Sequence, residues 1–199
     1  RVVLADTAND IRNRAVADWW NSHTAGGSAY LLAGTRAEAK LLNTLARQHA
    51  HEAGHLTGAT FDLRGRGFQV GDRIVLLRNI GGQLDLDTGA RCRVDNGMIA
   101  TITHINHHSS DINIELANGR HLQLTRDPVQ AGCTDHGYAT TIHTAQGVTA
   151  DTCHGLLTGT ETRQQLYTMA TRGRHHRRWS PRWSRRWSRR WSRRWSRRW

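Results

Sequence analysis

Two segments near the end of the 199-residue sequence carry side chains that could contact phosphate groups. Residues 137–147 read Gly-Tyr-Ala-Thr-Thr-Ile-His-Thr-Ala-Gln-Gly, and residues 165–174 read Gln-Leu-Tyr-Thr-Met-Ala-Thr-Arg-Gly-Arg. The hydroxyl of Thr141 and the imidazole of His143 can donate hydrogen bonds to phosphate oxygens without selecting a base, and Arg172 carries a planar, permanently charged fork. Each also has a simpler explanation, because a Thr-Ile-His run in a strand usually belongs to the core and an arginine at a helix end usually interacts with the helix dipole.

The beginning of the sequence predicts a helix, a buried strand and a second helix. Apolar residues recur at helical spacing over 7–22, and Thr7 or Asn9 can cap this helix. Residues 29–33 form a short apolar run, which is typical of a strand covered on both faces. A second helix is expected over 35–49, capped by its first residue. Its expected apolar stripe consists of Ala37, Leu41, Leu42, Leu45 and Ala46. This order is typical of an α/β layer.

Residues 56–126 predict a compact β structure. Short strand-like runs alternate there with turns that contain Gly and Asn. The expected strands are 59–63, 73–78, 90–94, 98–105, 111–116 and 121–125. In the last pair, a three-residue loop at 118–120 pairs Leu116 with Leu122 and places the apolar rows of both strands on one face, so we expect this loop or a bulge. Strands of this length suggest a small barrel.

Helical and buried-strand character returns after this β region. Residues 137–143 and 150–157 are expected to be strands, with a turn at 144–147 between them. The spacing Thr158-x-x-Glu161 predicts a capping box that opens a helix ending near Thr171 and Gly173. The layout is therefore an α/β layer that is interrupted by a β insertion and then resumed.

The two phosphate-suited segments resemble motifs V and VI of RecD-like superfamily 1 helicases, in the same order along the chain. The β insertion resembles the SH3-like subdomain of that branch. Further features narrow the resemblance to the helicase part of MobF-type conjugative relaxases (TraI/TrwC/TraA-like), particularly actinobacterial ones. These features are the pair Trp19-Trp20 and the runs at 31–36 and 42–47, whereas the runs at 71–79 and 94–97 carry the resemblance to the SH3-like subdomain. The resemblance implies an incomplete second RecA-like domain with an inserted SH3-like small β-barrel.

The resemblance also implies a role for each residue of the motif V segment. In such a motor, single-stranded DNA (ssDNA) lies across two RecA-like domains and ATP binds between them. Thr141 and His143 would contact the DNA backbone. Gln146 and Gly147 would bind nucleotide and link the DNA contact to the nucleotide cleft.

The motif VI segment would supply further nucleotide contacts. The resemblance makes Arg172 the arginine finger, which stabilises charge on the transferred γ-phosphoryl group. Tyr167 would pack beneath it, and Arg174 is a weaker candidate for the same cleft. The motor implied by the resemblance is an ATP-dependent 5′–3′ DNA helicase, although the residues themselves leave the polarity of translocation open.

The expected domain organisation follows from these segments. Residues 1–55 form the first part of the RecA-like domain, and 56–130 form the SH3-like insertion. Residues 131–176 form the second part of the RecA-like domain, with motifs V and VI. Residues 177–199 form a low-complexity tail that repeats Trp-Ser-Arg-Arg and is expected to be disordered.

The positive charge of the sequence is concentrated in this tail. The formal net charge is +12, and eleven arginines with no acid place +11 of it in residues 177–199. Three interpretations stay open: a translated DNA repeat or frameshift, an arm that grips phosphate and stacks bases on Trp, and a segment on a membrane surface. The alternative function is therefore a non-enzymatic nucleic-acid-binding remnant that acts through its basic tail.

The sequence lacks a phosphate-binding loop of the form Gly-x-x-x-x-Gly-Lys-Ser/Thr. Its single lysine, Lys40, follows Ala39 within a predicted helix. We therefore expect no ATP hydrolysis or unwinding by this chain alone. ATP and Mg²⁺ would bind only in a longer protein whose N-terminal RecA-like domain is the partner. We further expect ssDNA as ligand, no membrane partner and a monomer.

Cysteine and histidine usage predicts neither a disulfide framework nor a metal site. The three cysteines favour a reducing compartment, and no signal peptide or membrane span is apparent, so a cytoplasmic location is expected. Three groups of residues could suggest a metal, but none has the spacing of a fourth ligand. They are His104, His107 and His108 with Asp111, Cys133 with His136, and Cys153 with His154.

Overall fold

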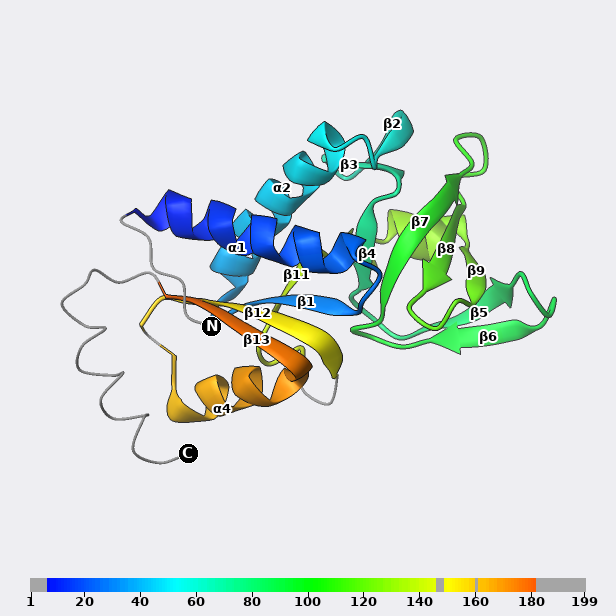
Figure 1. Cartoon of the computed structure of the whole chain (residues 1–199). Helices are drawn as coiled ribbons and strands as arrows, with labels where there is room; N and C mark the ends of the chain where they lie inside the picture. The colour runs from blue at the N-terminus through cyan, green and yellow to red at the C-terminus, as the bar shows by residue number, and fades with distance from the viewer. Residues whose placement is uncertain (1–6, 146–148, 160, 182–199) are drawn as a thin grey trace, which may run out of the picture. The chain divides into compact units, whose positions relative to one another are not determined.

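The structure, a computed structural model, describes residues 7–145, 149–159 and 161–181 (Figure 1). The chain folds as two compact units. The first contains the residues up to His49 and from Ala139 onward, and the second contains Ala50–Tyr138. The segment 56–130, which was expected to be the insertion, lies within the second unit.

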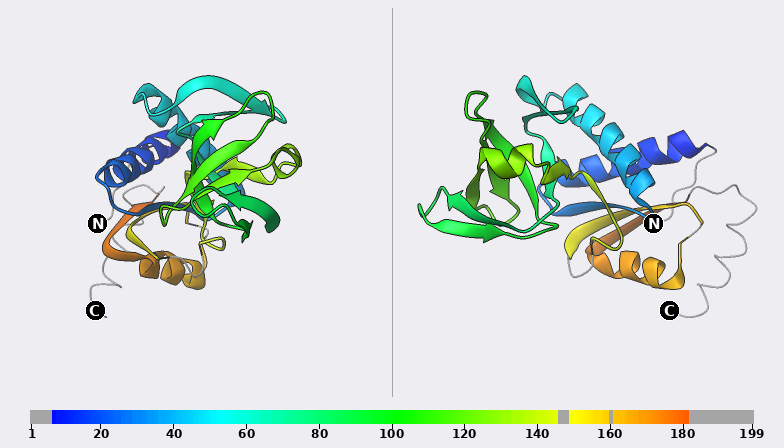
Figure 2. Two further views of the ribbon diagram at one scale, coloured as in Figure 1. Left: turned by 90° about the vertical axis from the view of Figure 1, so that its right-hand side faces the viewer. Right: turned by 180° about the vertical axis from the view of Figure 1, so that it is seen from behind.

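The first unit is a parallel sheet with helices on both faces. Its strands stand side by side in the order β11-β1-β12-β13. The helices α1 and α2 lie on one face and α4 lies on the other, as both further views show (Figure 2). This arrangement confirms the predicted α/β layer. The bounds are α1 Ala8–Thr24, β1 Ala29–Ala33, α2 Arg36–Glu52, β11 Ala139–Thr141, β12 Ala150–Leu157, α4 Arg163–Arg172 and β13 Gly173–Pro181.

Helix α1 and strand β1 confirm the predictions made for 7–22 and 29–33. Thr7 caps α1, because its hydroxyl oxygen accepts the backbone N–H of Asp10 at 3.1 Å. Trp19 is fully buried on the inner face of the helix. Its indole N–H donates to the carbonyl oxygen of Ala29 at 3.2 Å. A large apolar ring with a satisfied N–H therefore joins the helix to the sheet.

The apolar stripe predicted for α2 is partly wrong. Leu41 is 47% exposed, whereas Leu42 is fully buried. Glu38 turns inward, where it pairs with Arg12 of α1. Because Glu38 of this pair points inward, the face of the helix that packs against the sheet is rotated away from the apolar stripe that the sequence predicts. The residues of α2 that are buried in the apolar interior are Ala39, Leu42, Ala46 and Ala50.

Helix α4 begins one turn later than predicted. Its capping box consists of Thr162 and Gln165, whose side chains bond each other's backbone N–H groups at 3.2 and 2.8 Å. Glu161 instead accepts the N–H and hydroxyl of Thr158, so the predicted box is a tight turn after β12. The sequence contains two consecutive boxes, at 158–161 and 162–165, and only the second is followed by a helix. Gly173 ends α4, as predicted.

Strand β13 corrects the predicted start of the tail. Residues 177–181 were expected to be disordered, but β13 extends to Pro181 and pairs in parallel with β12. Backbone hydrogen bonds hold such a strand, so an apolar side-chain pattern is not required to start it. The remainder of the tail, 182–199, lies outside the described residues.

The second unit is built from antiparallel strands. Seven of them form one sheet in the order β10-β4-β7-β8-β9-β5-β6, and β2 and β3 form a separate ribbon. All six predicted strands are present, and β3, β5, β10 and the short helix α3 were not predicted. The small SH3-like barrel stays a prediction. The bounds are β2 Thr57–Leu63, β3 Arg66–Val70, β4 Arg73–Leu76, β5 Ile80–Asp85, β6 Arg91–Val94, β7 Ile99–Ile105, β8 Ile112–Leu116, β9 His121–Leu124, α3 Arg126–Gln130 and β10 Thr134–His136.

The hairpin of β8 and β9 has the predicted facing rows but a different register. Ile114 pairs with Leu122, and Leu116 faces Arg120, whose carbonyl oxygen accepts the N–H of Leu116 at 2.9 Å. The loop therefore contains three residues, 117–119, and the predicted pairing of Leu116 with Leu122 is wrong by two residues. A shift of two keeps every side chain on the same face, so the apolar rows still align.

Asp85 makes the second unit sensitive to acid. The guanidinium of Arg120 donates to its carboxylate at 2.5 and 3.2 Å and lowers the pKa of Asp85 from 3.8 to about 2. A carboxyl whose pKa is lowered on folding stabilises the fold above its unfolded pKa, and this contribution is lost as the pH falls. We expect the free energy of unfolding to fall between about pH 4 and pH 2, and Asp85→Asn to weaken this dependence in urea titrations.

A matched control for this experiment is Asp95→Asn. Asp95 also pairs with an arginine, Arg93, at 3.0 Å, but both side chains are largely exposed. Exposed ion pairs contribute little to stability. The control should keep the acid sensitivity of the parent chain, and an Asp85→Asn variant with unchanged sensitivity would contradict the role of Asp85.

Candidate nucleic-acid interface

The candidate interface lies where the parallel strands of the first unit end. Strand β1 ends at Ala33, which stands beside Thr141 of β11 and Leu156 of β12. The loops that follow these three strands therefore meet at one edge of the sheet. In open α/β sheets, the carboxyl edge of the strands is the usual place for ligands.

Thr141 and His143 lie together at this edge. The hydroxyl oxygen of Thr141 accepts the backbone N–H of Thr144 at 3.3 Å and lies 2.9 Å from the Thr144 hydroxyl. The carbonyl oxygen of Thr141 accepts the N–H of Ala145 at 3.1 Å. Thr141 thus closes a turn over 142–145, and His143 is exposed on that turn. An incoming phosphate can meet the imidazole directly, and it can receive the proton of Thr141 when Thr144 is the donor between the two hydroxyls.

Glu161 places a carboxylate at the same edge. It accepts the N–H and hydroxyl of Thr158 at 2.8 and 2.7 Å and the N–H of Gly159 at 2.9 Å. A Cβ at Gly34 would lie 2.9 Å from its Oε1 atom. These contacts hold the loop after β12 against the end of β1. The sequence prediction assigned Glu161 to a helix cap and missed this role.

Arg172 lies at the opposite edge of the sheet. It is the last residue of α4, and the next residue, Gly173, pairs with Ala150 at the start of β12. Thr141 and Leu156 both pair with Ala33 of β1, so they lie at the same height along the strands. The six residue-to-residue steps from Ala150 to Leu156 correspond to about 20 Å along a strand. The structure therefore separates the expected DNA contacts from the expected arginine finger.

The guanidinium of Arg172 folds back onto its own helix. Its Nε atom donates to the carbonyl oxygen of Thr168 at 3.3 Å, and the side chain is partly buried. This is the interaction with a helix end that the simpler explanation predicts. A second nitrogen of the guanidinium, Nη2, donates to the hydroxyl oxygen of Thr171 at 3.5 Å, and both bonds are long for N–H···O.

The other predicted nucleotide contacts have different outcomes. Tyr167 is 67% exposed and does not pack beneath Arg172. Residues five positions apart on a helix are separated by about 140° around its axis, so the two side chains cannot share a face. Arg174 lies in β13, but its side chain is outside the described part of the structure, as are Gln146 and Gly147 entirely.

The clusters considered for metal binding do not assemble in the described residues. Within these residues, no three or more His, Cys, Asp or Glu side chains come together around a possible ion. Cys133 and Cys153 are buried. Over the same part of the chain, none of the helices has the length and apolar character that crossing a membrane requires.

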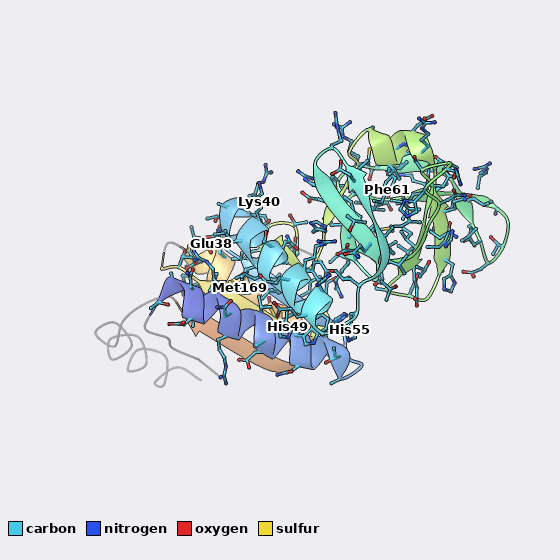
Figure 3. The ribbon with its side chains drawn as sticks, turned by 90° about the horizontal axis from the view of Figure 1, so that it is seen from above. Glu38, Lys40, His49, His55, Phe61 and Met169 are labelled. Carbon is cyan, nitrogen blue, oxygen red and sulfur yellow. The ribbon has the colours of Figure 1, made fainter. Side chains whose placement is uncertain are left out.

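An ion pair joins α1 and α2 within the first unit. Two nitrogens of Arg12 donate to the two carboxylate oxygens of Glu38, each at 2.9 Å. Only 13% and 11% of these side chains are exposed, and the hydrogen bonds that Arg12 donates to Glu38 raise the pKa of Arg12. Glu38 lies among the helices, whereas Lys40 points away from them (Figure 3). The pair was missed because its members stand 26 residues apart.

Comparison with known sequences relates the chain to conjugal transfer proteins. No family model matches it. It is 29% identical over 182 residues to a protein named "Probable conjugal transfer protein TraA" from Sinorhizobium fredii, covering 87% of this chain and 15% of that protein. It is 30% identical over 167 residues to conjugal transfer protein TraA of Agrobacterium fabrum, covering 81% and 14%. The chain therefore spans about one seventh of the length of these relatives.

Comparison with solved structures shows that the fold is similar to part of the structures of Bacteroides Pif1. The crystal structure of Bacteroides Pif1 with ADP-AlF3 and ssDNA has a TM-score of 0.56 at 16% identity, covering 97% of this chain and 51% of that one. Bacteroides Pif1 bound to ssDNA has a TM-score of 0.53 at 18% identity, covering 78% and 41%.

Proposed function

We propose that the chain is the second RecA-like domain, with its β insertion, of the DNA helicase motor of a conjugative relaxase. In this proposal the turn of Thr141 and His143 binds the backbone of ssDNA, and Arg172 acts as an arginine finger. The observation that carries it is the position of this turn at the carboxyl edge of a parallel sheet whose fold is shared with Pif1. Sequence similarity to TraA supports the assignment to conjugation.

The nucleotide site of the proposed motor is shared with another domain. Arg172 supplies one positive fork, but the chain has no phosphate-binding loop. Arg172 could therefore contact the γ-phosphate, but the N-terminal RecA-like domain would hold ATP and Mg²⁺. Translocation in the 5′–3′ direction, a monomeric motor, an SH3-like insertion and an actinobacterial source are parts of the same proposal.

The basic tail supports a second candidate function. Its charge of +11 would attract any nucleic acid, and tryptophans can stack on unpaired bases. A remnant that binds through this tail needs neither Thr141 nor His143. The two candidates can therefore be separated by substitutions in the body and truncation of the tail.

Truncation has to preserve β13, so the chain should end at Pro181. In this shortened chain, the double substitution Thr141→Ala and His143→Ala is expected to weaken binding to a fluorescent oligo-dT about tenfold, as two lost phosphate contacts predict. The matched control, Thr44→Ala with His51→Ala, removes the same residue types from exposed positions of α2. It should bind like the parent.

The outcomes of this experiment distinguish the two candidates. Unchanged affinity in the Thr141 and His143 variant would contradict the helicase-domain proposal. Complete loss of binding on removal of 182–199 would favour the tail. Retained binding with a weaker dependence on salt is expected instead, because fewer phosphates are neutralised without the tail.

A further inference from the structure

Strand β11, which carries Thr141, lies at the edge of its sheet and contains only three residues. On one side it pairs with β1, where Leu31 is the partner of Ala139. The N–H of Ile142 continues this contact by donating to the carbonyl oxygen of Ala33 at 3.1 Å. Three residues paired along one side form a weak element, since edge strands are held by a single neighbour.

A side chain from α2 holds the other side of this strand. The Nδ2 atom of Asn43 donates to the carbonyl oxygen of Ala139 at 3.0 Å. The backbone N–H of Ala139 donates to the Oδ1 atom of Asn43 at 2.8 Å. A carboxamide presents one donor and one acceptor with the spacing of a peptide group, so Asn43 pairs with Ala139 as a neighbouring strand would.

Other residue types cannot make this double contact in the same place. A carboxylate of the same size accepts from the N–H of Ala139 but has no proton for its carbonyl oxygen. Leucine and alanine offer neither group. The requirement is therefore specific to the amide of Asn43, and it comes from a helix whose own position is held by Glu38 and the buried Leu42.

The contact lies next to the candidate DNA-binding turn. Ala139 stands two residues before Thr141, whose hydroxyl and carbonyl oxygens organise the turn over 142–145. With Asn43 on one side and β1 on the other, the backbone leading into the turn is held along both edges. Without Asn43, this backbone is held by β1 alone, and the position of His143 becomes less defined.

We propose that Asn43 is a positioning residue that locks β11 so that its turn presents Thr141 and His143 to ssDNA. This inference rests on the proposed function, because it assumes that the turn is where DNA binds. Asn43 does not touch the DNA itself. Its effect is transmitted through the backbone of Ala139.

The first test measures amide hydrogen exchange in the full chain by NMR. Asn43→Ala should speed exchange of the Ala139 amide about tenfold or more and leave the amides of Leu31 and Leu32 in β1 unchanged. Asn43→Asp keeps the acceptor, so it should keep the Ala139 amide protected. Thr44→Ala, at the adjacent exposed position, is the matched control. Unchanged exchange at Ala139 in Asn43→Ala would overturn the proposal even if the turn binds DNA.

The second test follows the His143 amide signal during titration with oligo-dT, so binding elsewhere on the chain does not enter. Asn43→Ala should require about five- to tenfold more oligonucleotide for the same signal change, Asn43→Asp should require less than Asn43→Ala, and Thr44→Ala should match the parent. If the Ala139 amide exchanges faster in Asn43→Ala but the titration curves of this variant and the parent are equal, the proposal would also be overturned. A parent chain whose His143 signal does not respond would instead show that the proposed function itself is wrong. If Asn43→Ala does not fold, the folded Asn43→Asp variant decides the test. Its titration should require more oligonucleotide than the parent chain and the Thr44→Ala control, but the His143 signal should still respond.

Discussion

Replacing Arg172 by alanine in a protein that also contains the ATP-binding RecA-like domain is expected to reduce ssDNA-stimulated ATP hydrolysis by a factor of about 10³ to 10⁵. A guanidinium stabilises negative charge that develops on the γ-phosphoryl group in the transition state, so its loss lowers kcat more than it changes nucleotide binding. Arg172 lies at the end of α4, where its Nε atom donates to the carbonyl oxygen of Thr168 at 3.3 Å. Steady-state kinetics with oligo-dT would measure the effect.

Two matched variants show whether the loss is specific to the finger. Arg163→Ala removes an exposed arginine from the first turn of the same helix and should leave kcat unchanged. Arg172→Lys keeps the charge but loses the planar fork, so most of the activity should still be lost. The chain alone should show no ATP turnover, whether it is the parent or carries any of these substitutions. Full activity of Arg172→Ala in the two-domain protein would remove Arg172 from the mechanism.

Breaking the ion pair of Arg12 and Glu38 should destabilise the chain by about 3–5 kcal/mol. Glu38→Gln leaves the guanidinium of Arg12 largely buried without its carboxylate, and an uncompensated buried charge is strongly unfavourable. The two donors and two acceptors of this pair meet at 2.9 Å between α1 and α2. The free energy of unfolding from urea titrations would measure the loss.

A double variant separates the penalty of an unpaired charge from the net value of the pair. Arg12→Met with Glu38→Leu replaces both charges by apolar groups of similar size, and it should recover most of the stability. Arg93→Met is the control, because Arg93 pairs with Asp95 at 3.0 Å and both side chains are largely exposed. It should change stability by about 1 kcal/mol or less. A double variant as unstable as Glu38→Gln would contradict this account of the pair.

Local patterns predicted most of the elements but not always their limits. The period of 3.6 residues located α1, and alternation with turn residues located most strands of the second unit. Strands β3, β5 and β10 were missed, since β5 contains Gly81-Gly82 and β10 has only three residues. Such segments become strands because neighbouring strands offer hydrogen-bonding groups, which a local pattern does not contain.

Two other errors have the same origin. The box at Thr158 satisfies the local rule for a helix start as well as the box at Thr162 does, and only the packing of α4 against the sheet selects between them. The β8–β9 hairpin was predicted with the correct faces because side-chain alternation has a period of two. Its register was wrong by two residues because both registers satisfy that alternation.

The amino-acid sequence was enough to predict the α/β class, the inserted β region and the separation of a nearly neutral body from a tail of charge +11. These features depend on composition and short-range periodicity, which any stretch of chain carries within itself. The fold was needed to show that β11 is an edge strand, that Asn43 binds Ala139 from 96 residues away, and that Thr141 and Arg172 lie at opposite ends of the strands. The backbone and polar side chains of any sequence could form hydrogen bonds with many different partners. The packing of the whole unit selects one strand order and one set of long-range polar contacts.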